Sequence, residues 1–323
     1  MTNPLLTTAD LPRYAAIRPE HIESAIDRVL ADNRVELERL LAAHHTYTWD
    51  TLIQPLEELE DRLNKAWSPV NHLHSVRDSE DLRAAYNACL PKLSAYYTEL
   101  GQHEGLYRAY RQIADGPEYP RLDPAQRKVI DNALRDFRLS GIALPPAQRD
   151  RYKAIMQELA QLSAKFSENV LDATQGWTQH LGDEAQLAGL PESAKALARQ
   201  TARQRDLDGW LLTLELPSYL PVLNYADDRE LRRTLYDAYC TRASDQGPNA
   251  GQWDNGAVME RILSLRHEVA QLLGFHDYSD YSLATKMAES PDQVLAFLDD
   301  LAGRAQPQAQ RELDELRRFA HDR

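Results

Sequence analysis

The sequence predicts a mainly α-helical fold with a small two-stranded β ribbon. Over most of the chain, apolar residues recur at intervals of three and four, the spacing of one face of an α-helix. Several of these segments begin with residues that are typical of helix starts. Two short segments alternate instead, as half-buried strands do. No motif repeats at a fixed period of about 20–50 residues, so a regular solenoid is not expected.

The first expected helices lie in the N-terminal third. One extends from about Pro19 to Ala43, because its apolar residues keep to a single face. The next extends from about Leu52 to Trp67, and Pro69 is expected to break or kink it, since proline lacks the amide hydrogen and clashes with the preceding turn. Asp78 or Ser79 is expected to cap a third helix.

Three later helices have recognisable starts. In Asp123-Pro124-Ala125-Gln126, the aspartate accepts bonds from free amides, proline fits the first turn, and glutamine bonds back to the cap. Gly141 is expected to end this helix. Pro145-Pro146 opens a longer helix, and Ser290-Pro291-Asp292-Gln293 repeats the capping pattern near the end of the sequence.

The two alternating segments are Trp177–Leu181 and Trp210–Leu216. We expect them to pair as a small antiparallel ribbon, with a helical insert at Leu190–Arg205 between them. Asp228–Tyr239 and Met259–Gly274 then return to helical spacing.

Charge and composition exclude several classes of protein. A net charge of -13 argues against general nucleic-acid binding, for which basic patches supply most of the affinity. No apolar run reaches the roughly 18 residues that a membrane span needs, so no membrane partner is expected. The first ten residues lack the basic and apolar regions of a signal peptide.

The chain has two cysteines, Cys89 and Cys240, which are too few for a disulfide framework. Both lie in helical apolar patterns, so we expect them to be small buried hydrophobic residues. These features favour a reducing compartment and predict a cytoplasmic location.

A zinc-peptidase helix needs two histidines at positions i and i+4, with a glutamate after the first as general base. The nearest match is His267-Glu268-Val269-Ala270-Gln271, in which glutamine, a poor zinc ligand, replaces the second histidine. We interpret this segment as a His-Glu dipeptide on a helix surface. The sequence therefore offers no catalytic, cofactor-binding or metal-binding residue with a complete motif, and no cofactor is expected in this chain.

Other histidines and two pairs of tyrosines are further candidates for site residues. On a helix, His72 and His74 point about 200° apart and do not share an ion, whereas on a strand they would. His276 lies beside an aspartate in a loop, where acid–base chemistry is conceivable but a structural role is favoured. Tyr236 and Tyr239 are three residues apart, as are Tyr278 and Tyr281, so each pair lies on one face of its helix. This spacing indicates packing, and contact with a peptide is the alternative.

The order of segments from Trp210–Tyr225 to Leu263–Met287, which includes Phe275-His-Asp-Tyr278 and Ala284-Thr-Lys-Met287, resembles the M3 family of zinc metallo-oligopeptidases, the relatives of thimet oligopeptidase. The resemblance runs along the whole chain but is looser over the first 120 residues. It implies an elongated helical lobe that forms one wall of a deep channel. It also implies that zinc lies in a second lobe, on a His-Glu-x-x-His helix that this sequence does not contain.

The resemblance implies a function and a division of the chain. We expect a helical region at 1–175, a β ribbon with its insert at 176–226, and a helical region at 227–323 that leads into a zinc-binding catalytic domain beyond Arg323. The last residues show helical charge patterning without a stop, which suggests a cut within a helix. We expect the non-catalytic N-terminal part of an oligopeptidase that cleaves short peptides. The alternative is a stand-alone helical binding or scaffold protein, or a degenerate pseudopeptidase.

Overall fold

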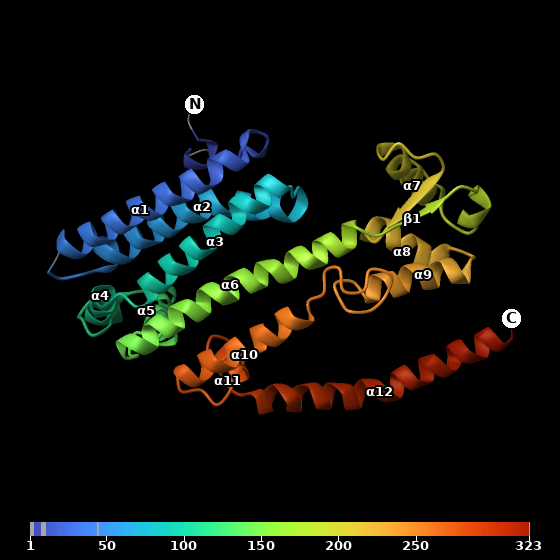
Figure 1. Cartoon of the computed structure of the whole chain (residues 1–323). Coiled ribbons are helices and arrows are strands. Elements are labelled where there is room, and N and C mark those ends of the chain that lie inside the picture. Colours follow the sequence, from blue (N-terminus) through green and yellow to red (C-terminus); the bar gives the residue numbers. More distant parts are fainter. Residues whose placement is uncertain (1–2, 8–10, 44, 323) are drawn as a thin grey trace.

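The described part of the protein is mostly helical, with one two-stranded ribbon (Figure 1). This computed structural model describes residues 3–7, 11–43 and 45–322. The α-helices of this part are α1 (Pro19–Ala43), α2 (Gln54–Val76), α3 (Glu80–Gly101), α4 (Glu104–Ala114), α5 (Pro124–Leu139), α6 (Pro146–Gln175), α7 (Glu192–Gln204), α8 (Leu216–Tyr225), α9 (Arg229–Cys240), α10 (Gly256–Leu272), α11 (Tyr278–Leu283) and α12 (Pro291–His321). The strands are β1 (Thr178–Leu181) and β2 (Trp210–Thr213). The predicted fold class, mainly α with a small antiparallel ribbon, is confirmed.

The N-terminal helices form a bundle in which α1 packs on both α2 and α3. Its core contains Ile22 and Ile26 of α1 and Leu63 of α2, all 0% exposed. A second apolar cluster joins α1 to α4 and α5 and contains Ile113 and Ile130. Burial of this apolar surface is the main force that holds such a bundle together. The prediction that α1 keeps one apolar face is thus confirmed.

The long helix α6 passes through the middle of the molecule, with α3 on one side and α10 on the other (Figure 1). Ile155 of α6 packs against Leu265 and Val269 of α10. The flanking ion pair between Arg261 and Glu158, with a nitrogen–oxygen distance of 2.6 Å, is largely exposed. Exposed pairs contribute only about 0–1 kcal/mol, so the apolar contacts hold α10 on α6.

The ribbon is antiparallel, with Thr178 opposite Thr213 and Leu181 opposite Trp210. The insert between the strands is α7, which packs on β2, as predicted. The apolar core of the ribbon extends from Trp177 through α7 and α8 to α9. The boundaries after residues 175 and 226 stay a prediction.

Gly209 makes the turn into β2 possible. Its φ is +85°, and a Cβ atom at this position would lie 2.4 Å from the backbone oxygen of Leu181. We expect Gly209→Ala to lower the free energy of unfolding by about 2 kcal/mol, because the left-handed backbone and the clash both disfavour a side chain. Gly303→Ala in α12, where nothing lies within 4 Å, should instead be neutral or slightly stabilising. Urea unfolding of both variants tests this, and equal losses would contradict it.

Of the break or kink predicted at Pro69, the break is wrong, because α2 continues through this residue to Val76. An internal proline removes one backbone hydrogen bond and costs about 3 kcal/mol. Here Pro69 is buried beside Val70, which is 0% exposed, so tertiary packing offsets the cost. The second predicted strand ends at Thr213, and α8 begins at Leu216 because a proline occupies its first turn.

Only one of the two cysteines is buried as predicted. Cys89 is 0% exposed in the bundle core, and burial raises the pKa of its thiol to about 12. Cys240, in contrast, is exposed at the last position of α9. Its helix buries Leu231, Leu235 and Ala238, and position 240 falls outside that apolar face.

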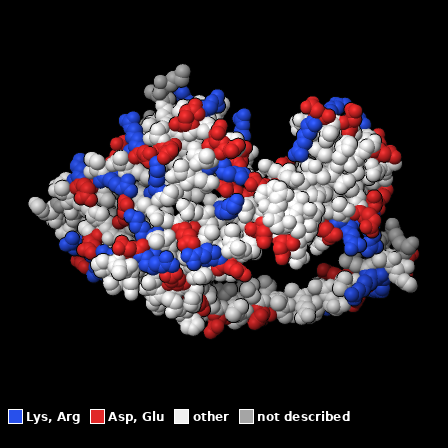
Figure 2. Space-filling view, in the orientation of Figure 1, with Lys and Arg blue, Asp and Glu red and all other residues white. Residues whose placement is uncertain are grey.

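The last helix, α12, leaves the body after α11, with which it is in contact near its start. None of its described side chains is buried. Figure 2 shows open space between this helix and the rest of the molecule. No described helix is both long and apolar enough to cross a membrane.

Candidate functional site

The His-Glu dipeptide lies on α10, with His267 exposed to solvent. Both carboxylate oxygens of Glu268 accept hydrogen bonds of 2.5 Å from the guanidinium of Arg151 on α6. These bonds lower the pKa of Glu268. Both oxygens of this carboxylate are thus engaged by an arginine of α6, and Gln271 stands where a second histidine would be needed. The segment therefore does not fit a zinc ion.

His72 and His74 both lie on α2 but in opposite environments. His72 is exposed, and its ring lies 5.4 Å from that of Tyr14. His74 is 7% exposed and stacks on Tyr86, with 4.1 Å between the ring centroids. The two rings are thus placed against different parts of the fold.

His74 belongs to a largely buried group of ionisable residues that we call the polar junction: His74, Asp78, Arg83, Glu168 and Asp172. Its histidine Nε2 lies 3.5 Å from Glu168 Oε1 and 3.9 Å from Asp78 Oδ1. Among the residues that the structure describes, His74 Nε2 and Asp78 Oδ1 are the buried side-chain atoms without a hydrogen-bond partner. A buried polar atom without a partner has lost its contact with water and gained no hydrogen bond, which is unfavourable. The packing of the surrounding helices must therefore offset this cost.

Arg83 of α3 is the cation of the polar junction. Its guanidinium donates to Asp78 Oδ2 from Nε at 2.8 Å, and to both oxygens of Asp172 on α6 at 2.6 and 2.7 Å. These bonds raise the pKa of Arg83 and lower that of Asp172. Arg83 therefore joins the α2–α3 connection to α6. From the sequence, Asp78 is predicted only as a helix cap, because no local pattern marks its pairing with Arg83.

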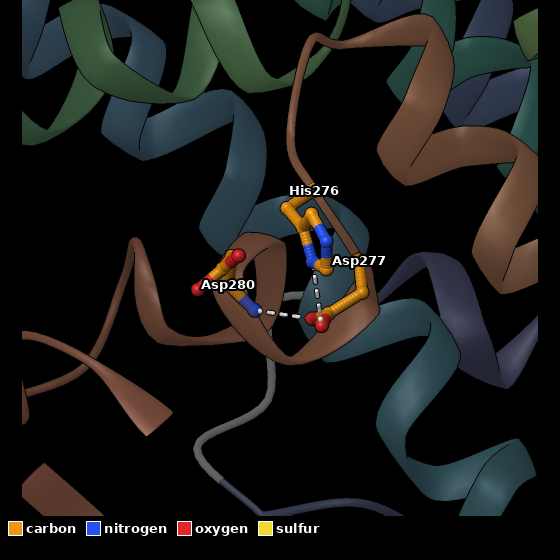
Figure 3. A group of neighbouring side chains, drawn as sticks. All are labelled: His276, Asp277 and Asp280. Carbon is orange, nitrogen blue, oxygen red and sulfur yellow. Dashed lines mark hydrogen bonds and ion pairs between the residues drawn. The ribbon is translucent and has the colours of Figure 1, made fainter. Parts of the chain in front are cut away.

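His276, Asp277 and Asp280 lie close together at the start of α11 (Figure 3). Asp277 Oδ1 accepts hydrogen bonds from the amides of Ser279 and Asp280, at 2.8 and 3.1 Å, and its Oδ2 lies 3.2 Å from His276 Nδ1. Hydrogen bonds, first that of the Ser279 hydroxyl, lower the pKa of Asp277 to about 2. Capping of α11 accounts for this arrangement without a metal ion.

Protonation of Asp277 is expected to fray the start of α11. Because the pKa of Asp277 in the folded chain, about 2, lies below its ordinary value of 3.8, its stabilising effect is present above that value and is lost as the pH falls toward 2. The protection factors of the Ser279 and Asp280 amides, which compare observed with intrinsic exchange at each pH, should fall over this interval. Asp277→Asn should show no such transition, and constant protection factors in the unchanged chain would contradict the prediction.

The tyrosine pairs divide between packing and exposure. Tyr239 stacks on Tyr219 at 4.2 Å, whereas Tyr236 is 54% exposed. Tyr281 is half-buried beside Tyr152, to which it is hydrogen-bonded. The packing interpretation holds for Tyr239 and Tyr281, and contact with a peptide stays a prediction.

Large apolar side chains are exposed on two sets of helices. On α12 they recur at helical spacing and form a stripe, which we call the α12 stripe: Leu295, Phe297, Leu298, Leu301, Leu313 and Leu316, each at least 42% exposed. Further exposed apolar residues are Leu216, Leu220 and Tyr225 of α8, Tyr236 of α9, and Met259 and Leu263 of α10. Apolar surface on this scale is unusual for a monomer and marks an interaction surface.

Comparison with known proteins finds a match to a known family in each half of the chain. Residues 26–149 match the N-terminal domain of neurolysin and thimet oligopeptidase, and residues 222–323 match peptidase family M3. The chain is 57% identical to oligopeptidase A of Escherichia coli over 320 residues, which cover 99% of this chain and 47% of that protein.

More distant relatives match over the same part. Oligopeptidase A of Haemophilus influenzae is 53% identical over 319 residues, with 99% of this chain and 47% of that protein covered. Dipeptidyl carboxypeptidase of Escherichia coli is 26% identical over 319 residues, with 97% of this chain and 46% of that protein covered. The chain thus spans about half the length of the curated relatives it matches.

Proposed function

The chain belongs to peptidase family M3, and from this premise we propose that it is the N-terminal, non-catalytic part of a zinc-dependent oligopeptidase. The observation that carries the proposal is the exposed α12 stripe, on a helix that is separated over part of its length from the body by open space (Figure 2). Apolar stripes of this kind are buried in a complete fold. The part of the relatives that this chain does not span is the natural candidate to cover it.

In the proposed parent protein, this half forms one wall of a channel that admits short peptides and excludes folded proteins. Such a wall contributes binding contacts along the peptide and orients it toward the reacting bond. The zinc ion, the catalytic glutamate and the donors to the transition state belong to the second half, because His267 and Glu268 do not fit a zinc ion. Zinc would lower the pKa of a bound water and polarise the peptide carbonyl.

We propose a cytoplasmic location for the parent protein, which the two unpaired cysteines support. Its partners are short peptides and the second half of the same protein.

Zinc content and cleavage of a quenched fluorescent peptide test the proposal. Both are measured on this chain and on the chain extended by the downstream reading frame. We expect only the extended protein to bind about one zinc ion and to cleave the peptide. The same peptide sequence placed inside a folded protein should resist cleavage by the extended protein.

Two results would overturn the proposal. If the 323-residue chain binds stoichiometric zinc and cleaves the peptide by itself, the roles assigned to its histidines are wrong. If the reading frame does not continue into a His-Glu-x-x-His helix, a stand-alone helical scaffold or a degenerate pseudopeptidase replaces the peptidase.

A further inference from the structure

A groove of about 510 Å³ lies along α6, between α3 and the α10–α11 pair. Its floor is a row of α6 side chains that includes Met156, Leu159 and Ser163, whose spacing of three and four places them on one face. From Tyr152 at one end to Ser163 at the other, the helix rises about 16 Å at ~1.5 Å per residue. That length accommodates about five residues of extended chain.

Arg266 of α10 stands at the Tyr152 end of this groove. It is the one charged residue in the lining of the groove, as far as the structure describes it. Its guanidinium carbon lies 4.8 Å from the centre of the Tyr278 ring. Within the described ranges, Arg266 has no ion pair, whereas Arg151 and Arg261, which also lie between α6 and α10, are both paired with glutamates.

These contacts specify the chemistry of a ligand. A guanidinium at the end of an apolar groove favours a carboxylate, to which it donates two parallel hydrogen bonds. Aromatic and apolar side chains along the floor favour an extended chain with apolar side groups.

We infer that this groove binds the C-terminal end of a short apolar peptide, with its terminal carboxylate on Arg266 and its side chains along α6. That the ligand is a peptide rests on the proposed function. The position of the site and the direction in which the peptide binds rest on the groove and on Arg266. Every unblocked peptide carries this carboxylate, so the contact adds affinity without requiring a particular sequence.

Binding of a fluorescein-labelled peptide, Ala-Leu-Phe-Ala-Leu, to the 323-residue chain tests the inference by fluorescence anisotropy. The peptide with a free carboxylate should bind about tenfold more tightly than its C-terminal amide. Arg266→Gln should reduce the affinity for the free acid to that for the amide. The affinity for the amide should stay unchanged, because the variant removes only the carboxylate contact.

A second pair of variants tests the floor of the groove. Ser163→Trp fills it and should weaken binding of both peptides about tenfold. Ser167→Trp, on the same helix but outside the lining, should change neither affinity, and the same holds for Arg28→Gln on the exposed face of α1. Thermal unfolding of each variant checks that the chain is folded, and the two serine variants decide the question if Arg266→Gln does not fold.

Equal binding of acid and amide to the unchanged chain would overturn the inference, as would no binding of either. So would sedimentation showing that the chain dimerises and that Arg266→Gln makes it monomeric, because a second copy would then occupy the groove. The proposed function is tested separately. Peptide binding by this chain with an inactive extended protein would refute the proposed function, and an active extended protein without carboxylate-dependent binding here would refute the groove.

Discussion

Replacing Arg83 with methionine is expected to lower the free energy of unfolding by about 3 kcal/mol. Arg83 binds Asp78 and Asp172 at once, and the side chain of Asp78 is only 8% exposed. Removal of the guanidinium leaves Asp78 buried without its compensating cation, in a group where Glu168 lies near the same nitrogen of His74. An uncompensated buried charge costs several times more than a lost surface pair.

Urea unfolding measures this loss, and Arg28→Met is the matched control. Arg28 pairs with Asp32 on the surface of α1, where the two side chains are 70% and 52% exposed. That variant should stay within about 0.5 kcal/mol of the unchanged chain. A loss of similar size in both variants would mean that the polar junction does not hold α3 on α6.

The fold was largely predictable, because local chemistry and tertiary packing agree along most of the chain. Asp123 and Gln126 form the predicted capping box, and Ser290 caps α12 as expected. The failures are places where packing overrides a local preference. Pro69 would end an isolated helix, but its burial keeps α2 continuous. No local pattern contains that information.

The candidate sites were less predictable, because they depend on residues that are distant in sequence. Asp78 and Asp172 both bind Arg83, although 94 positions separate them. Arg266 is one of many arginines in the sequence, and only its place beside Tyr278 and, within the described residues, its lack of an ion pair single it out. What the sequence did indicate is that the nearest zinc motif, His267 to Gln271, is incomplete.

The second prediction with a large effect concerns self-association through the α12 stripe. We expect the 323-residue chain to self-associate at micromolar concentration and to bind the dye ANS, because it exposes this stripe. Leu298 and Leu316 lie on one line of α12, since 18 residues make five turns of an α-helix. The double variant Leu298→Gln/Leu316→Gln should raise the dissociation constant for self-association at least a hundredfold. Each leucine that is no longer buried removes about 1.5–3 kcal/mol.

Sedimentation equilibrium and ANS fluorescence measure the effect, with Asp299→Gln/Arg317→Gln as the control on neighbouring positions. At concentrations at which all three chains are monomeric, their thermal stability should be the same, because no described side chain of α12 is buried. In the extended protein the outcome should reverse: the leucine variant should lose stability and activity, since the stripe is then part of the core. A leucine variant that leaves the extended protein unchanged would show that the second half does not pack on α12, and the proposal that the two halves form one enzyme would lose its physical support.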